Sequence, residues 1–454
     1  MSRLANFLEQ LRNYSHRLCI EGGGGPSYTY GEMLEQLDQW TLRFDKLNVE
    51  PGCVIGVRAD YSASAVSALL AIFARNAIAA LIPRTHDSTR FLSDACAAAL
   101  LELSVDGGYE WWPISSPNTH PLMDRLRAAG ESGVVIFTSG STGLPKAALL
   151  SIESFLYKFR STGRCFRTLA FLLLDHVAGL DTLFYTLASG GTLILTLRRD
   201  PPSILQLIDS HRVEVLPTSP SFLRLLCASR DGNKHDLSSL KVITYGSEAM
   251  DPSTLSRLNA RFPNAQISQK YGTTETGSPR SVSRGNDSLW LKIKSDGVET
   301  NVIDNVLWIR SEGLMLGYLN APSPVNEQGW YCTGDLVDVD GDWIKFRGRV
   351  ADTINVGGEK VAPAEVEQSI LELDFVRDAL VSGELHTLLG QVVTAQVALT
   401  PSSPSRAEAV KLIRQHCQAC LARYKVPVRI DIVVGELTND RQKAQRVRAS
   451  RVEE

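Results

Sequence analysis

Residues 134–148, VVIFTSGSTGLPKAA, combine a strand pattern with a loop of hydroxyl groups that ends on a lysine. The first four are apolar β-formers and indicate a buried strand. Gly140 and Gly143 permit sharp turns, which bring backbone N–H groups close to an anion. Lys146 adds a compact cation, and hydroxyl donors come from Thr138, Ser139, Ser141 and Thr142. A polyphosphate is the ligand that this composition suits best.

This loop differs from the phosphate-binding loop of NTPases, because no Gly-Lys-Ser/Thr opens a helix after it. A flexible surface loop is the alternative, since glycine and serine are common in loops. Linkers seldom combine an apolar β-run, dense hydroxyl groups and a Pro-Lys pair. A binding loop is therefore the better interpretation.

Four later segments carry groups that suit a nucleotide. Residues 246–249 (GSEA) follow an apolar run with small side chains, which let a flat ligand approach the backbone. Residues 271–275 (YGTTE) place an aromatic ring, two hydroxyls and a carboxylate close together. Residues 331–335 (YCTGD) end a strand with a carboxylate that can hold a vicinal diol. Residues 347–367 form a basic turn, a Gly-Gly loop and a helix start.

Taken singly, these segments could be turns, a surface carboxylate and a hairpin, and Lys443 in NDRQKAQR could be a solvated tail residue. Together with the loop at 138–146, and in this order, they resemble the adenylate-forming superfamily over nearly the whole chain. That superfamily comprises acyl- and aryl-CoA ligases, adenylation domains and luciferases.

The resemblance implies a role for each matching residue. The β- and γ-phosphates would be held by Thr138, Ser139, Gly140, Ser141, Thr142, Gly143 and Lys146. The nucleoside would be held by Gly246, Ser247, Glu248, Tyr271, Gly272, Thr273, Asp335 and Arg349, with Tyr271 on adenine and Asp335 on the ribose hydroxyls. Glu275 would hold Mg²⁺. The implied catalytic residues are Thr274 near the α-phosphate, His176 beside the acid pocket, and Lys443 between the acid and the α-phosphate.

The chemistry of acid activation agrees with those roles. A carboxylate is a weak nucleophile and is repelled by the triphosphate, so the enzyme must neutralise charge and align the reacting groups. Lys146, Lys443, Mg²⁺ and backbone N–H groups can do this electrostatically. No general base is required, because a carboxylate is already ionised at neutral pH.

The sequence departs from the family pattern at two positions. Ala351 occupies the hinge position, where relatives often carry Asp or Lys; a hinge needs torsional freedom more than a particular side chain. Gln442 precedes Lys443, where a glycine is usual, so Lys425 and Arg441 remain alternatives for the C-terminal cation.

The resemblance places the acid pocket in the stretch after Phe171 and beside Gly246 and Tyr271. The amino-acid-anchoring Asp of peptide-synthetase domains is not at the matching position, which favours a hydrophobic fatty, aryl or other organic acid. The alternative is that Asp175 binds an amine of the substrate. A structural role for His176 is as compatible with the sequence as a catalytic one.

The elements that must position these groups follow an α/β pattern from residue 28 to about 349. Apolar runs that predict buried strands are 53–57, 78–82, 134–138, 192–197, 213–216 and 242–245, and predicted helices include 204–210 and 221–228. Residues 302–309 and 343–346 predict short strands of an antiparallel or barrel-like subdomain.

A polar turn at 347–352 marks the predicted domain boundary. Residues 1–348 would form an ATP- and acid-binding core of layered α/β sheets with a small β-barrel-like subdomain. Residues 349–454 would form a small α+β lid domain, which the resemblance implies is mobile. Pro363 and Glu365 are helix-start signals within it, followed by an apolar face of Val366, Ile370 and Leu373.

Bulk properties exclude several classes of protein. The 454 residues carry a formal net charge of −3, which argues against nucleic acid as a partner. No signal-peptide pattern opens the sequence, and the apolar stretch 63–82 is interrupted by Arg75 and Asn76, so we expect a cytoplasmic protein without membrane insertion. The 8 cysteines are expected to be free thiols, and His416-Cys417-x-x-Cys420 lacks the further ligands that a metal site needs.

Three functions are compatible with these features. The first is an acid–thiol ligase that uses ATP, Mg²⁺ and CoA. The second is a stand-alone adenylating enzyme that loads the phosphopantetheine thiol of an acyl carrier protein, or another nucleophile such as an amine. The third is a catalytically inactive nucleotide-binding relative, and the retained Lys146, Glu275, Asp335 and Arg349 argue against it.

Overall fold

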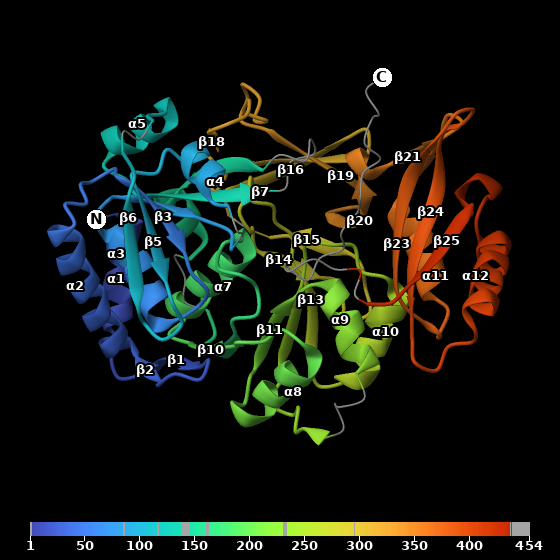
Figure 1. Ribbon diagram of the computed structural model, residues 1–454, viewed down its shortest axis with the longest axis horizontal. Helices are drawn as coiled ribbons and strands as arrows, with labels where there is room; N and C mark the ends of the chain where they lie inside the picture. The colour runs from blue at the N-terminus through green and yellow to red at the C-terminus, as the bar shows by residue number, and fades with distance from the viewer. Residues whose placement is uncertain are drawn as a thin grey trace.

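The computed structural model describes residues 2–84, 87–115, 118–138, 145–159, 163–229, 234–294, 296–435 and 437. These residues form four β-sheets with helices between and around them (Figure 1). The predicted fold class, layered α/β sheets followed by a smaller α+β unit, is confirmed.

The first sheet has the order β13-β12-β11-β9-β10-β1-β2, and all its pairings are parallel except that of β1 with β2. Its strands are β1 (Leu18–Gly22), β2 (Tyr28–Thr29), β9 (Arg167–Leu169), β10 (Thr192–Leu195), β11 (Val215–Thr218), β12 (Val242–Tyr245) and β13 (Gln266–Gln269). Helices α8 (Pro201–Ser210), α9 (Pro220–Ala228) and α10 (Pro252–Arg261) share one core cluster with this sheet.

The second sheet has the order β18-β8-β7-β4-β3-β5-β6. Its strands are β3 (Val54–Arg58), β4 (Ile78–Leu81), β5 (Ala99–Leu103), β6 (Tyr109–Pro113), β7 (Gly133–Thr138), β8 (Lys146–Ser151) and β18 (Gly317–Tyr318). The short helices α4 (Thr89–Asp94) and α5 (Pro121–Ala129) cover its outer face.

The largest core cluster lies between these two sheets and contains buried residues from both. Its helical members are α1 (Arg3–Arg12), α2 (Tyr30–Lys46), α3 (Ala63–Ala74), α6 (Ile152–Phe155), the 3₁₀ turn η1 (Leu156–Phe159) and α7 (Val177–Ala188). The sequence of α3 is apolar on all sides, and the helix is buried on nearly all of them. This agrees with the buried helix predicted within residues 63–82. No helix of the described residues combines the length and apolar character needed to cross a bilayer.

The third sheet is antiparallel, with the order β14-β15-β20-β19-β17-β16. Its strands are β14 (Ser281–Ser283), β15 (Leu291–Ile293), β16 (Val298–Ile303), β17 (Val306–Ser311), β19 (Tyr331–Asp340) and β20 (Trp343–Arg349). The prediction of one strand over 302–309 is wrong. Asp304 and Asn305 adopt φ of 50° and 62° and close a hairpin between β16 and β17.

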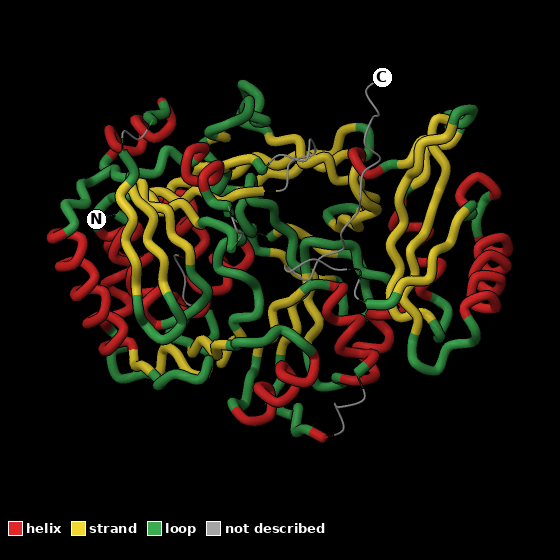
Figure 2. The backbone as a smooth tube through the Cα atoms, in the orientation of Figure 1, coloured by secondary structure: helices red, strands yellow, loops and turns green. Residues whose placement is uncertain are grey.

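The fourth sheet contains β21 (Ile354–Val356), β22 (Glu359–Val361), β23 (Val376–His386), β24 (Gly390–Leu399) and β25 (Arg429–Val433). Strand partners therefore change between β20 and β21, where the 3₁₀ turn η3 (Val350–Asp352) lies. Helices α11 (Pro363–Leu371) and α12 (Arg406–Cys420) pack on this sheet, and α12 lies at the right-hand end of Figure 2. A further 3₁₀ turn, η4 (Arg423–Lys425), precedes β25. Helix α11 begins at Pro363, as its start signals predict.

Three helices beside the first sheet start with the same local signal. Asp200, Ser219 and Asp251 each cap a helix through their side chains and precede a proline at the first helical position. The side-chain oxygen accepts a free N–H of the first turn, while proline has no N–H to satisfy. These signals determine where α8, α9 and α10 begin after the loops at the carboxyl ends of the strands.

A buried ion pair joins the fourth sheet to the core. Arg224 of α9 donates from Nε to Asp378 Oδ1 of β23 at 2.9 Å, and Asp251 lies 3.6 Å from the same guanidinium. The side chains of Arg224 and Asp378 are each 8% exposed. Ser253 Oγ adds a contact by donating to the carbonyl of Leu371 at 3.1 Å.

We expect Arg224→Met to lower the free energy of unfolding by about 3–5 kcal/mol, because it leaves buried carboxylates without a partner. Urea unfolding followed by tryptophan fluorescence measures the loss. Arg310→Met is the matched control: it breaks the exposed pair with Glu299, and we expect a change of about 0–1 kcal/mol. Equal losses in the two variants would contradict the assignment of Arg224 as a stabilising contact.

Candidate active site

The β7–β8 hairpin carries the predicted phosphate-binding loop. Thr138 and Lys146 are opposite each other in the antiparallel register, so the loop leaves the end of this hairpin. Its residues Ser139, Gly140, Ser141, Thr142 and Gly143 lie outside the described residues. Lys146 Nζ lies 4.9 Å from the centroid of the Tyr318 ring, a cation–π distance. The loop therefore starts and ends at defined positions beside Tyr318.

Residues 271–277 form a tight turn after β13. The Thr276 hydroxyl accepts from Thr273 N at 3.0 Å, and the Thr273 hydroxyl accepts from Thr276 N at 3.2 Å. A Cβ at Gly272 would lie 2.5 Å from the Gly277 carbonyl oxygen, so only glycine fits there. Thr274 and Glu275 are buried within this turn. The turn holds a hydroxyl and a carboxylate in fixed positions.

Glu275 is oriented by a tyrosine from the second sheet. Tyr318 OH donates to Glu275 Oε1, and the Glu275 backbone carbonyl accepts from Met315 N at 2.8 Å. Burial and the Glu275 carboxylate raise the pKa of Tyr318, which keeps the phenol protonated as a donor. A single oriented carboxylate fits Mg²⁺, which proteins bind through one or two carboxylates together with phosphates and water.

Tyr271, Asp335 and Arg349 form the most tightly connected part of the site. Tyr271 OH donates to Asp335 Oδ2 at 2.8 Å, and Arg349 Nε donates to Asp335 Oδ1 at 2.9 Å. Burial raises the pKa of the Asp335 carboxyl, and the Arg349 guanidinium opposes this shift. Each carboxylate oxygen has a second lone pair, so Asp335 can still accept from a diol.

Phe346 covers one face of the Tyr271 ring. The two rings are stacked with centroids 4.7 Å apart and an interplanar angle of 9°. A base stacked on Tyr271 would therefore use the opposite face.

The GSEA segment follows β12 with a strained backbone. Ser247 has φ of 72°, a conformation that L-residues other than Asn and Asp rarely adopt. A Cβ at Gly246 would lie 2.7 Å from the Lys270 carbonyl oxygen, so the ends of β12 and β13 lie close together. Glu248 Oε2 accepts from Ser221 N at 3.1 Å and from Ser221 Oγ at 2.6 Å. Glu248 is thereby tied to α9, which carries Arg224.

His176 is the N-cap of α7, and its Nδ1 accepts from Ala178 N at 3.3 Å. This contact gives His176 a structural role, and its catalytic role stays a prediction. Lys443 and Arg441 lie outside the described residues. Lys425 Nζ is held by the Glu365 carboxylate at 2.6 and 2.8 Å, which favours a structural role for it.

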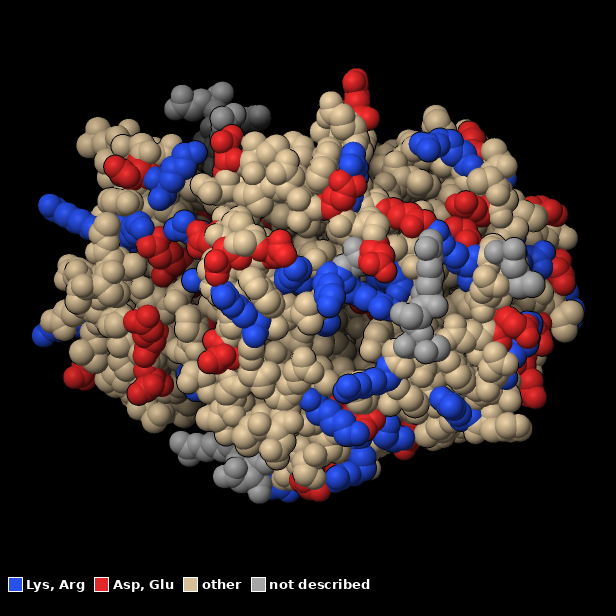
Figure 3. Space-filling view, turned by 180° about the vertical axis from the view of Figure 1, so that it is seen from behind, with Lys and Arg blue, Asp and Glu red and all other residues tan. Residues whose placement is uncertain are grey.

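Sequence reasoning missed Tyr318, Phe346 and Lys270 as neighbours of these groups. Phe346 was assigned only to a strand, and Tyr318 lies in the unremarkable segment GYLN. Tyr318 reaches the site because β18 pairs with β8, and Phe346 reaches it by ring stacking on Tyr271; contacts between segments so distant in sequence leave no local signal. On the face shown in Figure 3, lysine and arginine side chains surround a central hollow, as an anion-binding site requires.

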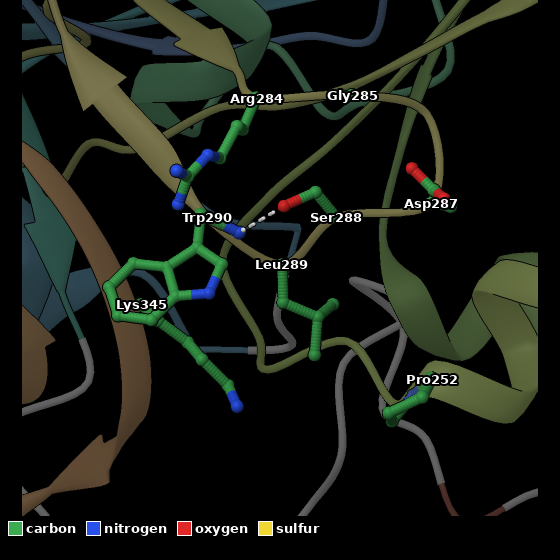
Figure 4. A pocket seen from close by; sticks show the side chains of 8 residues that line it. All are labelled: Pro252, Arg284, Gly285, Asp287, Ser288, Leu289, Trp290 and Lys345. Carbon is green, nitrogen blue, oxygen red and sulfur yellow. Dashed lines mark hydrogen bonds between the residues drawn. The ribbon is translucent and has the colours of Figure 1, made fainter. Parts of the chain in front are cut away.

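A second recess lies between α10, the β14–β15 turn and β20 (Figure 4). Its volume is about 500 Å³, and it is lined by Pro252, Arg284, Gly285, Asp287, Ser288, Leu289, Trp290 and Lys345. The described lining contains none of the predicted nucleotide-binding residues. Arg284 is occupied by an ion pair with Asp340 at 2.6 Å.

Family models match the chain in two consecutive parts. Residues 7–319 match the AMP-binding enzyme model, and residues 365–443 match the AMP-binding enzyme C-terminal domain. The chain belongs to the AMP-binding enzyme family. The predicted membership of the adenylate-forming superfamily is confirmed. At the level of the family, the prediction of an enzyme that activates an organic acid as its acyl-adenylate and transfers the acyl group to a thiol is also confirmed.

Curated relatives of this AMP-binding enzyme include CoA ligases. It is 25% identical to 4-coumarate–CoA ligase 3 of Arabidopsis thaliana over 89% of this chain and 83% of that protein. It is 31% identical to acyl-CoA synthetase 7 of Caenorhabditis elegans over 65% of this chain, and it spans 61% of that protein. The chain also spans 60–64% of several further CoA ligases that it matches.

Solved structures agree in fold. The anthranilate CoA ligase AuaEII in complex with anthranoyl-AMP superposes with a TM-score of 0.80 at 21% identity, over 95% of this chain and 93% of that one. The amide bond synthetase McbA from Marinactinospora thermotolerans gives a TM-score of 0.76 at 23% identity, over 95% of both chains.

If Asp335 binds the ribose hydroxyls, Asp335→Asn should raise the KM for ATP by about 10–100-fold, since a hydrogen bond to a charged group contributes about 1.5–3 kcal/mol. We expect 2′-deoxy-ATP to be a poorer substrate than ATP for the wild type and an equal one for the variant. Pyrophosphate exchange measures both nucleotides.

Asp338→Asn is the control, because Asp338 lies on the same strand and pairs at the surface with Arg347. A deoxy discrimination that persists in Asp335→Asn would place the ribose contact elsewhere.

Proposed function

We propose that this enzyme activates a carboxylic acid with ATP and Mg²⁺ and transfers the acyl group to the thiol of CoA. The observation that carries the proposal is the convergence of Tyr271, Asp335 and Arg349, drawn from two sheets and linked by hydrogen bonds of 2.8 and 2.9 Å. An aromatic ring, a carboxylate and a guanidinium in contact are the groups that a purine riboside phosphate requires.

Within this proposal, different described residues bind different parts of the nucleotide. Tyr271 stacks on adenine through the face that Phe346 leaves open, and Asp335 accepts from the ribose hydroxyls. Arg349 has a half-exposed side chain, which allows it to contact both ribose and phosphate. Lys146 and the loop it closes bind the outer phosphates.

Glu275 is the proposed ligand of Mg²⁺, and Tyr318 orients its carboxylate. When bound, the ion neutralises phosphate charge. Thr274 lies one residue before Glu275 and would contact the α-phosphate. The buried turn that holds them costs no reorganisation when charge develops, and such preorganisation is a large part of electrostatic catalysis.

CoA is the proposed acceptor because the curated relatives with the widest coverage are CoA ligases. A carrier-protein thiol is the second candidate. The chain is 28% identical to phenyloxazoline synthase MbtB over 67% of its length, although it spans only 28% of that protein. The Gly357-Gly358 turn would line the thiol path, and both glycines have the positive φ that this turn demands.

The proposed boundary between core and lid at residues 348/349 lies at the end of β20, just before the η3 turn after which the strand partners change sheet. Ala351 lies within η3, directly after Arg349 and Val350. A rotation about this turn would carry the fourth sheet across the nucleotide site. A hydrophobic, aryl or other organic acid is the proposed substrate class, with its pocket beside Phe171, Gly246 and Tyr271.

Acid-dependent ATP–pyrophosphate exchange across a broad acid panel tests the proposal. We expect exchange with at least one organic acid, and thioester formation when CoA is added. Exchange with a thioester formed only on a phosphopantetheinylated carrier protein would favour the second candidate. Absence of exchange with every acid would contradict an activating enzyme and favour an inactive nucleotide-binding relative.

Lys443→Ala should lower the rate of exchange by about 10²–10³-fold, the cost of losing one donor to developing charge. ATP binding, measured by calorimetry, should be nearly unchanged, and thioester formation from a supplied acyl-adenylate should largely survive. Lys425→Ala is the control, since that lysine is paired with Glu365. Normal exchange in Lys443→Ala with loss in Lys425→Ala would move the role to Lys425.

A further inference from the structure

Lys270 lies at the carboxyl end of β13, directly before Tyr271. Lys270 is exposed to solvent. The side chain of Lys270 is therefore accessible to a ligand. The surrounding protein nevertheless lowers the pKa of its ammonium by desolvation. Among the described residues its ammonium has one hydrogen-bond acceptor, the Ser281 carbonyl at 3.4 Å. An ammonium has three donors, so Lys270 has capacity for a ligand.

Lys158 of η1 is close to Lys270 and is fully engaged. Its ammonium pairs with Asp181 of α7, donates to the Ser278 carbonyl at 2.6 Å, and lies 5.1 Å from the centroid of Phe159. Its side chain is 4% exposed. Lys158 therefore joins α7 to the turn that contains Thr274 and Glu275, and Asp181 is used in that contact.

Arg280 adds a third positive charge. Its guanidinium donates to the Lys158 carbonyl at 2.7 Å, and Lys158 and Arg280 both lower the pKa of Lys270, against the opposing effect of Asp181. Lys158 and Arg280 thus place positive charge near Lys270, and Asp181 places negative charge there. A cation that is partly desolvated beside others of its sign is stabilised by an anion.

The position of this group within the fold favours the acid rather than the nucleotide as the source of that anion. Parallel strands β11, β12 and β13 end together, and ligands of such sheets bind outside their carboxyl ends. The proposed phosphate-binding Lys146 and the proposed Mg²⁺ ligand Glu275 belong to the start of β8 and to the turn of residues 271–277. Asp181 lies in α7, the helix that follows the proposed acid-pocket segment at Phe171.

We propose that Lys270 binds a second anionic group on the carboxylic acid substrate, so that the preferred substrates are dicarboxylic acids or acids with a comparable anionic substituent. This inference rests on the proposed acid activation and names its substrate class. One carboxylate becomes the adenylate, and the other pairs with the ammonium of Lys270. The charges of Lys158, Asp181 and Arg280 act on that ammonium.

Matched acid pairs in the pyrophosphate-exchange assay test the inference on the full-length enzyme. The pairs are butanoate with succinate, benzoate with benzene-1,3-dicarboxylate, and octanoate with octanedioate. For the wild type we expect at least one diacid to exceed its monoacid in kcat/KM by about tenfold or more, the usual value of a charge-assisted hydrogen bond.

Lys270→Met removes the charge and keeps the length of the side chain. We expect the KM for the preferred diacid to rise by about tenfold or more, with kcat and the KM for ATP changed little. Lys270→Arg should keep the preference, and Lys270→Glu should shift it toward acids that carry an amine, such as 4-aminobutanoate. Lys241→Met is the matched control, because Lys241 precedes β12 at the amino ends of the same parallel strands, opposite the end that carries Lys270, and pairs with Glu214.

Three results would overturn the inference. Equal kcat/KM values for monoacids and diacids in the wild type would show that no second anion is recognised. A Lys270→Met variant that keeps the diacid preference would place the recognition elsewhere. A rise in the KM for ATP with every acid would assign Lys270 to the nucleotide phosphates. Exchange with monoacids alone therefore contradicts this inference and leaves the proposed function intact, whereas absence of all exchange contradicts both.

Discussion

The buried carboxylate of Asp335 is the constraint on which the arrangement of the site depends. Removing a carboxylate from water is costly unless charged and polar partners replace the lost hydration. Here Arg349 and Tyr271 supply those partners on separate oxygens. Arg349 can do so because β19 and β20 pair it directly opposite Asp335. Tyr271 comes from the end of β13 in another sheet. One carboxylate thus ties the end of the parallel sheet to the antiparallel one.

That constraint also connects the nucleotide site to the C-terminal part of the chain. Arg349 is the last residue of β20 and directly precedes the turn at which strand partners change. On the other side of the site, Glu248 accepts from Ser221, whose hydroxyl accepts from Arg224 at 2.9 Å, and Arg224 pairs with Asp378 of β23. The fourth sheet is therefore linked to Glu248 by polar contacts and to Arg349 through the backbone of η3. A change in the position of the fourth sheet would therefore displace both residues, because hydrogen bonds are short and directional.

Sequence reasoning located features whose cause is local. The buried strand before the loop, the continuous apolar helix and strand of 63–82, and the helix start at Pro363 follow from patterns within a few residues. The hairpin at Asp304 and Asn305 was missed because two polar residues interrupt an otherwise continuous strand pattern only briefly. The neighbours Phe346 and Tyr318 were missed for a different reason. Phe346 contacts Tyr271 by ring stacking and Tyr318 contacts Glu275 by a hydrogen bond, and contacts between distant segments have no signature in either segment alone.

The distribution of charge explains how one site can hold two anions that repel each other. An acid and a triphosphate approach only if their charges are separately neutralised, since the interaction between like charges is strong where water is excluded. In the proposed site the chain supplies its cations on different elements: Lys146 at the start of β8, Arg349 at the end of β20, and Lys270 after β13. Burial lowers the pKa of Lys270, so an incoming anion would stabilise its charged form. In the proposed mechanism, substrate binding relieves a desolvation cost that the folded protein already carries, and the two anions are brought together by groups fixed before either arrives.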